Sequence, residues 1–112
     1  MPNTIATGSV DRTAKVWDLR NQPNCLRNFQ GHDYAIRNVK FSPHSREILA
    51  TSSYDMTAKV WNLSAPQDPL KYIHDKHSEF VVGLCWSLFD PFVLTTCSWD
   101  YQIHLTNLKG RL

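Results

Sequence analysis

Apolar residues gather in short segments of strand length, separated by polar and proline-containing turns. Such segments lie at residues 36–42, 47–53, 57–63 and 70–75, and most are rich in β-branched or aromatic side chains. The residues between them, for example SPHSR at 42–46, oppose continued strand pairing. No window has the apolar spacing of a helix. The pattern therefore predicts an all-β fold.

The strand pattern recurs with a fixed period. The stretch TGSVDRTAKVWDL at residues 7–19 returns as TSSYDMTAKVWNL at 51–63 and, less closely, as TCSWDYQIHLTNL at 96–108. The aspartates of the three copies lie 44 and 45 residues apart. An internal period of this length indicates a repeated supersecondary unit that stacks on its neighbours.

A second landmark keeps the same period. His32 and His77 are 45 residues apart, and each precedes the aspartate of its copy, Asp55 or Asp100, by 23 residues. Four strands in about 44 residues, with one GH-type and one WD-type dipeptide, are typical of a blade of a WD-repeat β-propeller. The sequence thus predicts four-stranded antiparallel blades.

The chain is too short for a closed propeller, because rings of this kind have about 4–8 blades. Residues 1–112 are expected to form a partial propeller of about two and a half blades. The predicted divisions are an incomplete blade at 1–30, a complete repeat at 31–76 and a last repeat at 77–112 that lacks its outer strand. The sequence therefore reads as the C-terminal part of a larger propeller.

A chain of buried polar side chains is expected inside each blade. A buried indole, imidazole, hydroxyl and carboxylate can satisfy one another, and one left unpaired costs about 1–3 kcal/mol. Trp61, His32, Ser53 and Asp55 resemble the structural tetrad of WD-repeat blades.

The last repeat offers only part of the same set. His77, Ser98 and Asp100 occupy the matching places, and Thr106 stands at the tryptophan position. The polar network of this repeat is therefore predicted to be incomplete.

The same serine, histidine and aspartate could be interpreted as a hydrolase triad. The set recurs with the blade period, lacks a G-x-S-x-G elbow and is expected inside packed strands. A structural role is therefore favoured, and no catalytic residue and no enzyme activity are predicted.

Composition and charge exclude several classes of partner. The chain has 12 lysines and arginines against 10 aspartates and glutamates, a formal charge of +2, and no long basic run. This balance gives no electrostatic footprint for nucleic acid or an anionic membrane. No apolar stretch is long enough to cross a bilayer, so direct membrane insertion is not expected.

Metal and disulfide chemistry are not predicted either. Cys25, Cys85 and Cys97 are odd in number and show no paired C-x-x-C spacing, so neither a disulfide framework nor a zinc site is supported. His74 and His77 have only Asp75 and Glu79 near them as further ligands in the sequence, and are interpreted as solvated turn residues. No metal and no cofactor are predicted.

A more specific resemblance covers most of the chain. The run GHDYAIRNVKFSPHSREILATSSYDMTAKVWN at 31–62, with KHSEFVVGLCWSLFDPFVLTTCSWD at 76–100, resembles the last blades of the peroxisomal receptors for type-2 targeting signals. The terminal LTNL departs from the tryptophan-aspartate ending. The resemblance implies a cytoplasmic receptor that cycles to the peroxisome. It also implies partners: type-2 signal peptides of matrix enzymes, a co-receptor and peroxisomal docking proteins.

The resemblance also points to one face of the propeller. Signals of this class present an amphipathic helix with a basic residue near one end, so the receptor should offer an apolar groove with an acidic margin. The turns with GHDYA, SSYDM, KHSEF and CSWDY should project together, opposite the SPHSR and SLFDP turns. The candidate binding residues there are Asp33, Tyr34, Tyr54, Glu79, Phe80 and Trp99.

Two other classes of function remain open. The first is a generic WD-repeat scaffold or adaptor in another complex, such as a ubiquitin ligase or a chromatin assembly. The second is an enzyme, for which the sequence offers only the rejected triad.

Overall fold

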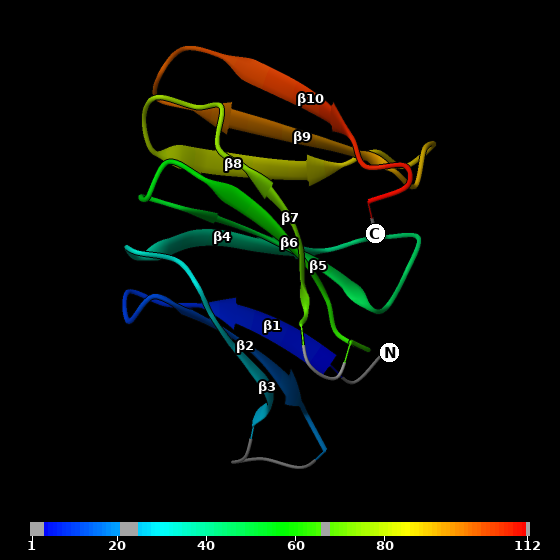
Figure 1. The fold of residues 1–112 in the computed structure, drawn as a ribbon. Coiled ribbons are helices and arrows are strands. Elements are labelled where there is room, and N and C mark those ends of the chain that lie inside the picture. The colour runs from blue at the N-terminus through cyan, green and yellow to red at the C-terminus, as the bar shows by residue number, and fades with distance from the viewer. Residues whose placement is uncertain (1–3, 21–24, 66–67, 112) are drawn as a thin grey trace.

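The computed structural model describes residues 4–20, 25–65 and 68–111. Within these ranges the chain forms ten β-strands in three antiparallel sheets (Figure 1). None of the described residues belongs to a helix long and apolar enough to cross a membrane. The all-β prediction is confirmed, and the three antiparallel sheets have three or four strands each, as expected for the predicted blades.

Each sheet is built from strands that follow one another along the chain. The first sheet has the order β1-β2-β3, the second β4-β5-β6-β7 and the third β10-β9-β8. The strands are β1 (Thr4–Gly8), β2 (Thr13–Asp18), β3 (Cys25–Gln30), β4 (Ile36–Phe41), β5 (Ile48–Ser53), β6 (Ala58–Asn62), β7 (Leu70–His74), β8 (Val81–Trp86), β9 (Val93–Ser98) and β10 (Ile103–Asn107). The repeat boundaries at 30/31 and 76/77 remain a prediction.

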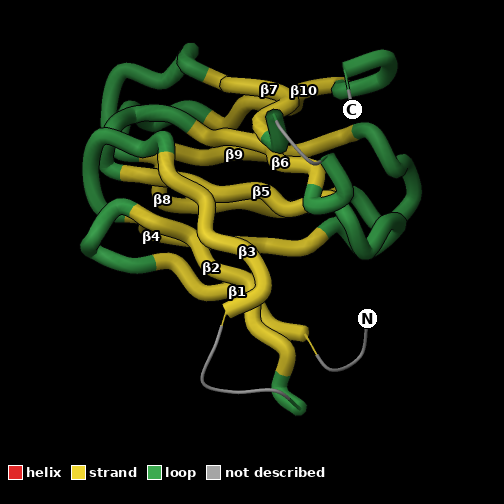
Figure 2. The backbone as a smooth tube through the Cα atoms, turned by 60° about the horizontal axis from the view of Figure 1, so that its bottom comes forward, coloured by secondary structure: helices red, strands yellow, loops and turns green. Residues whose placement is uncertain are grey.

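The second sheet lies between the other two (Figure 1), and its inner strands are covered on both faces. In Figure 2 the described residues are drawn as strands joined by loops and turns. Every residue of β5 is buried. A strand covered on both faces needs no alternation of apolar and polar residues, which explains the sequence ILATSS.

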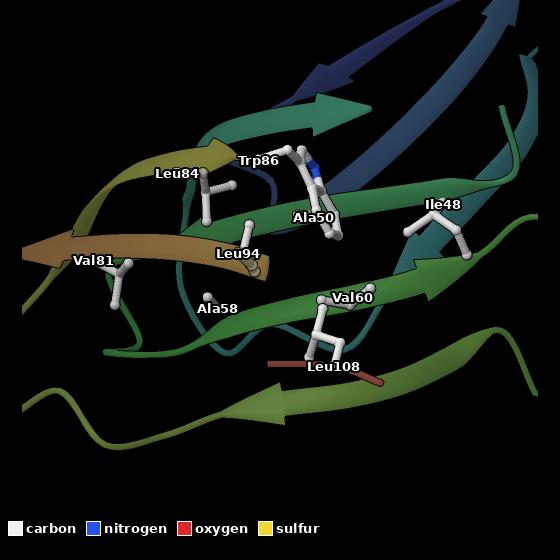
Figure 3. Close-up of a cluster of buried hydrophobic side chains, with 9 residues drawn as sticks. All are labelled: Ile48, Ala50, Ala58, Val60, Val81, Leu84, Trp86, Leu94 and Leu108. Atoms are coloured by element: carbon white, nitrogen blue, oxygen red, sulfur yellow. The ribbon is translucent and has the colours of Figure 1, made fainter. Parts of the chain in front are cut away.

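Alternate residues of β5 join two different cores, because successive side chains of a strand point to opposite faces. Leu49 packs with Trp61, Phe29 and other residues between the first and second sheets. Ile48 and Ala50 pack between the second and third sheets (Figure 3). The third sheet and the C-terminal turn complete this second core with Val81, Leu84, Trp86, Leu94 and Leu108.

The tight turn inside each sequence copy, which follows β1, β5 or β9, has the same backbone conformation in all three copies. Arg12, Met56 and Tyr101 have φ values of 74°, 71° and 66°, in the left-handed region that non-glycine residues seldom adopt. Each follows the aspartate that marks the repeat. A carboxylate oxygen of that aspartate accepts the backbone N–H two residues further on, at 2.9–3.0 Å. This Asx-type hydrogen bond fixes the turn and the direction of the side chains on it.

Candidate functional site

The turns that carry the candidate binding residues lie along one edge of the three sheets, at the left of Figure 1. Hydrogen bonds connect them in pairs. The Tyr54 N–H donates to the Ala35 carbonyl at 3.1 Å, and the Trp99 N–H donates to the Phe80 carbonyl at 3.2 Å. We call this edge the rim and define it as residues 31–35, 54–57, 75–80 and 99–102.

Three aromatic side chains from two neighbouring sheets meet on the rim. The ring of Tyr54, in the turn between β5 and β6, lies 4.7 Å from that of Phe80 and 6.5 Å from that of Trp99, measured between centroids. The rings of Phe80 and Trp99 are 5.1 Å apart. Trp99 keeps 58% of its surface exposed. A large, partly exposed aromatic cluster of this kind suits the anchoring of a partner side chain.

An apolar pocket lies beside this cluster. It is lined by Tyr34, Ala35, Tyr54, Met56 and Phe80. Tyr34 and Met56 are exposed, so the pocket opens to solvent. Its lining comes from the two turns of the second sheet and from the loop that enters the third sheet. The sequence placed Tyr34, Tyr54 and Phe80 on one face, and the structure brings them together.

A second hollow of the rim lies beside Trp99. It is lined by Glu79, Ser98, Trp99 and Tyr101. Glu79 therefore places a carboxylate at the margin of the aromatic surface. Tyr101 is fully exposed.

Asp33 contributes to the rim in another way. Its side chain is exposed, and its backbone N–H donates to a carboxylate oxygen of Asp55 at 3.1 Å. Asp33 lines neither of the two hollows.

Sequence reasoning missed two residues of this surface, Met56 and Tyr101. Both follow a repeat aspartate, have positive φ and are exposed. The signal for them was the repeat itself: a bulky residue directly after Asp55 or Asp100, at a turn position where smaller residues are favoured.

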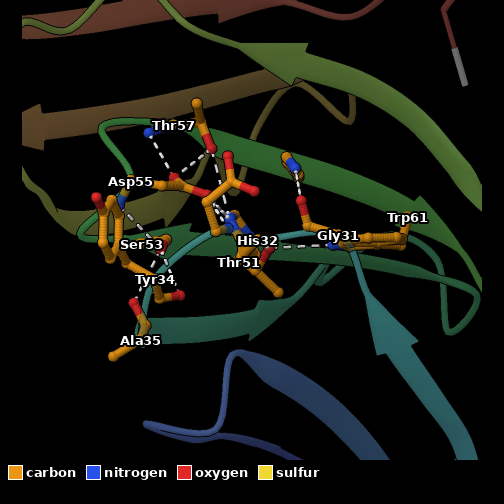
Figure 4. A network of polar contacts seen from close by, with 11 residues as sticks. Gly31, His32, Tyr34, Ala35, Thr51, Ser53, Asp55, Thr57 and Trp61 are labelled. Atoms are coloured by element: carbon orange, nitrogen blue, oxygen red, sulfur yellow. Dashed lines mark hydrogen bonds and ion pairs between the residues drawn. The ribbon is translucent and has the colours of Figure 1, made fainter.

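Beneath the rim, a chain of hydrogen bonds crosses the second sheet (Figure 4). His32 Nδ1 lies 2.8 Å from Asp55 Oδ2, and His32 Nε2 lies 2.6 Å from Thr51 Oγ1. The Trp61 indole N–H donates to the same Thr51 oxygen at 3.0 Å. These four side chains are connected from carboxylate to indole, so the buried polar groups of Asp55, His32, Thr51 and Trp61 all have partners.

The hydroxyl of this network is Thr51, and the prediction that Ser53 fills that place is wrong. Ser53 Oγ instead donates to the backbone carbonyls of Tyr34 and Ala35, at 3.0 and 2.9 Å, and accepts the Asp55 N–H at 3.1 Å. Thr51 and Ser53 are two residues apart on β5, so both side chains point to the same face. The sequence pattern alone cannot tell which of them reaches the imidazole.

The third sheet repeats the arrangement without the indole. His77 Nδ1 lies 2.9 Å from Asp100 Oδ2, and His77 Nε2 lies 2.8 Å from Thr96 Oγ1. Ser98 is again outside the network, because its hydroxyl accepts the Asp100 N–H at 3.3 Å. Thr106 stands where Trp61 stands in the second sheet, so the chain stops at Thr96.

The pKa values of the two aspartates reflect these contacts. Burial opposes the charged form of Asp55, but hydrogen bonds from His32 and Thr57 outweigh it and hold the pKa of the carboxyl well below its usual range. Burial also opposes the charge of Asp100, and the hydrogen bond from His77 contributes to holding its pKa low. Both carboxylates are ionised near neutral pH and fix the imidazole beside them.

A serine-histidine-aspartate triad is not assembled at these residues. The Ser53 hydroxyl is bonded to backbone carbonyls, and His32 is bonded to Thr51 and Asp55. The imidazole therefore has no serine to activate in the second sheet.

The interpretation of His74 and His77 as solvated turn residues is wrong. His74 keeps 6% and His77 keeps 5% of its surface exposed. His74 ends β7, and both rings pack against the third sheet. Sequence position alone suggested a polar loop, and the neighbouring sheet supplies the burial.

Two of the three cysteines are described. Cys85 and Cys97 are free thiols. The side chain of Cys25 lies outside the described part of the chain.

Comparison with known proteins gives one family. The family model of the WD domain, G-beta repeat, matches residues 2–18, 23–62 and 69–107. These ranges cover most of the chain.

Several proteins are similar in sequence. The chain is 46% identical over 86 residues to the Peroxisomal targeting signal 2 receptor of Mus musculus, an alignment of 77% of this chain and 27% of that protein. It is 45% identical over 60 residues to the receptor of the same name from Dictyostelium discoideum, covering 54% of this chain and 19% of that protein.

A protein with another name is also similar. The Nuclear distribution protein PAC1 of Ajellomyces capsulatus is 41% identical over 83 residues, covering 74% of this chain and 18% of that protein. The chain thus spans about a quarter or less of the length of these relatives.

Proposed function

The chain belongs to the WD domain, G-beta repeat family, and from this premise we propose that it forms part of a receptor for type-2 peroxisomal targeting signals. In this role the chain binds a short signal segment of a cargo protein and makes or breaks no covalent bond. The names of the relatives from Mus musculus and Dictyostelium discoideum support the proposal.

The observation that carries the proposal is the aromatic surface shared by two sheets. Tyr54, Phe80 and Trp99 lie within 6.5 Å of one another between ring centroids, next to an open apolar pocket. Aromatic residues in such positions supply much of the binding energy at interfaces. The apolar face of an amphipathic peptide would lie on this surface, and Glu79 would meet a basic residue at its margin.

The proposed cellular setting follows from the same resemblance. The receptor binds cargo in the cytoplasm and cycles to the peroxisome. A co-receptor and docking proteins of the peroxisomal membrane complete the delivery. The chain itself needs no cofactor for this role.

A scaffold function is the second candidate. The similarity to a nuclear distribution protein, at 41% identity, supports it, because the same repeat architecture serves a protein of another name. In a scaffold the rim would bind a different motif, with the same aromatic anchors. A peptide of the type-2 class would then bind no better than a scrambled peptide of the same composition.

We expect the substitutions Tyr54→Ala and Trp99→Ala, made together in the full-length protein, to weaken binding of a type-2 signal peptide at least about thirtyfold. Loss of one anchoring aromatic costs about 2 kcal/mol or more, which corresponds to that factor in Kd. Fluorescence anisotropy with a labelled signal peptide, in the presence of the co-receptor, measures the effect.

The matched control is Phe89→Ala. Phe89 is 97% exposed and lies in the turn between β8 and β9, at the opposite end of the strands from Trp99. It should leave the Kd unchanged. If the Kd were unchanged in the folded double variant and raised in Phe89→Ala, the peptide would bind on the face that carries Phe89 and not on the rim.

A further inference from the structure

Three histidines meet where the second and third sheets join. His74 ends β7, His77 lies in the loop that follows, and His104 lies on β10. His74 Nε2 is 2.8 Å from His104 Nδ1. The rings of His77 and His104 stack with centroids 3.9 Å apart and planes 8° apart, and those of His74 and His77 are 5.4 Å apart. We call His74, His77 and His104 the histidine cluster.

Among the residues that the structure describes, the corresponding place in the preceding repeat has one imidazole, that of His32 in the hydrogen-bond chain. Between the first and second sheets, Phe29 packs on Trp61 with ring centroids 5.1 Å apart. One period of 45 residues later, these two positions are His74 and Thr106. The apolar aromatic contact between sheets has thus been replaced by a polar contact between His74 and Thr106, and His104 stands at the position of Lys59.

The hydrogen bonds of the histidine cluster suit neutral rings. Thr106 Oγ1 lies 3.4 Å from His74 Nδ1, and His104 Nε2 lies 2.8 Å from Gln102 Oε1. Together with the contact of His74 Nε2 and His104 Nδ1, these contacts form a chain of three hydrogen bonds. Each hydrogen bond of this chain has one proton between its two heavy atoms. A second proton at the junction of His74 and His104 would set two N–H groups against each other.

His77 closes the cluster on its other side. Both of its ring nitrogens are already engaged, by Asp100 and Thr96. A proton added to His104 would therefore lie on a ring stacked against His77, and protons on both would place two like charges in contact.

A metal ion does not suit this arrangement as it stands. One nitrogen from each of the three rings lies within 4.8 Å of the others, which is the spacing of a possible ligand set. The lone pairs of an imidazole lie in the plane of its ring. The parallel rings of His77 and His104 cannot both direct a lone pair at one ion, and the nitrogens of His77 already have partners.

We propose that the histidine cluster is a pH-sensitive latch, which holds the second and third sheets together while His74 is neutral and loosens when His74 gains a proton. The latch adjoins the rim, because the loop at residues 75–80 starts directly after His74 and carries Glu79 and Phe80. Mild acidification would therefore act on the junction of the two sheets and on the aromatic surface beside it.

The charged surroundings of His74 favour its neutral form. Burial lowers the pKa of His74 below its ordinary value, and His104, His77 and Lys76 act in the same direction, while Asp75 opposes them. The titratable and charged groups that face it or pack beside it are Tyr72, Asp75, Lys76, His77, Asp100, His104 and Arg111.

The sign of the effect follows from linkage. The unfolded chain, in which a histidine titrates near 6.5, binds more protons than the folded chain once the pH falls below that value. Stability is complete above about pH 6.5 and is lost as the pH falls toward the pKa of the folded state. The carboxylates of Asp55 and Asp100 act in a separate window, below about pH 4.

The test is urea unfolding of the full chain at pH 7.5 and 5.5, compared with His74→Phe, which installs the residue of the preceding repeat. One histidine kept neutral in the folded state lowers the folding equilibrium constant about tenfold over this range. Between pH 7.5 and 5.5 the folding equilibrium constant should therefore fall about tenfold less in His74→Phe than in the unsubstituted chain.

An equal drop in His74→Phe and in the unsubstituted chain would overturn the proposal. NMR titration of the imidazole nitrogens of the unsubstituted chain gives a second measure that does not depend on folding of the variant. A midpoint for His74 below 6.5 supports the latch, and a midpoint at or above 6.5 contradicts it.

Discussion

Trp61→Ala is expected to lower the free energy of unfolding by about 3–5 kcal/mol. Trp61 is 2% exposed and packs on Phe29 in the core between the first and second sheets. Its removal leaves a large cavity at this junction. It also removes the indole N–H that donates to Thr51, so a buried hydroxyl loses a partner. Chemical denaturation followed by circular dichroism measures the change.

Trp17→Ala is the matched control, because Trp17 holds the same position in the preceding copy. Trp17 is only half-buried and donates to Thr7 Oγ1 at 3.0 Å. A loss of about 1–2 kcal/mol is expected there. Equal losses for the two tryptophans would mean that the second sheet is not enclosed by its neighbours.

Asp55→Ala is expected to lower the free energy of unfolding by about 3 kcal/mol at neutral pH. The carboxylate accepts hydrogen bonds from His32, from the backbone of Asp33 and from Thr57. Each buried donor left without an acceptor costs about 1–3 kcal/mol. Because the pKa of Asp55 is held low, this contribution is complete above about pH 4 and is lost as the pH falls further.

Asp11→Ala provides the comparison in the first copy. Asp11 is exposed, and its carboxylate accepts hydrogen bonds from Thr13 within its own turn. We expect a loss of about 0.5 kcal/mol, as for an ordinary surface substitution. The interpretation of Asp55 as part of a buried network would be wrong if both aspartates gave the same small loss. The free energies of unfolding of the two variants are compared from denaturant unfolding curves at pH 7.

The strands and the rim could be predicted because both depend on periodicity. The repeat fixes which turns share an end of the strands, so the sequence alone places Tyr54 and Trp99 on one edge. Antiparallel pairing within each sheet then places the turns between β5 and β6 and between β9 and β10 at that edge. Sequence spacing carries this information in full.

The hydroxyl of the polar network could not be predicted from spacing. Thr51 and Ser53 lie on the same face of β5, and the choice between them depends on where His32 enters above the strand. That entry is set by the loop from β3 to β4, whose path is a matter of tertiary packing. The same reasoning failed for Ser98 and Thr96 in the third sheet, for the same reason.

The burial of His74 was also beyond the sequence. Its own segment, followed by Asp75 and Lys76, has the composition of a solvated loop. The ring is covered by His104, which lies 30 residues later on another sheet. Contacts between sheets of this kind appear only when the stacking of the repeats is known.

The proposed function requires that the rim, and not the opposite face, binds the signal peptide. This is measured by photo-crosslinking, with p-benzoylphenylalanine at Trp99 or at Phe89 of the full-length protein and a labelled type-2 signal peptide. We predict an adduct from position 99 that unlabelled peptide competes away, and none from position 89. An adduct from position 89 alone would contradict the account.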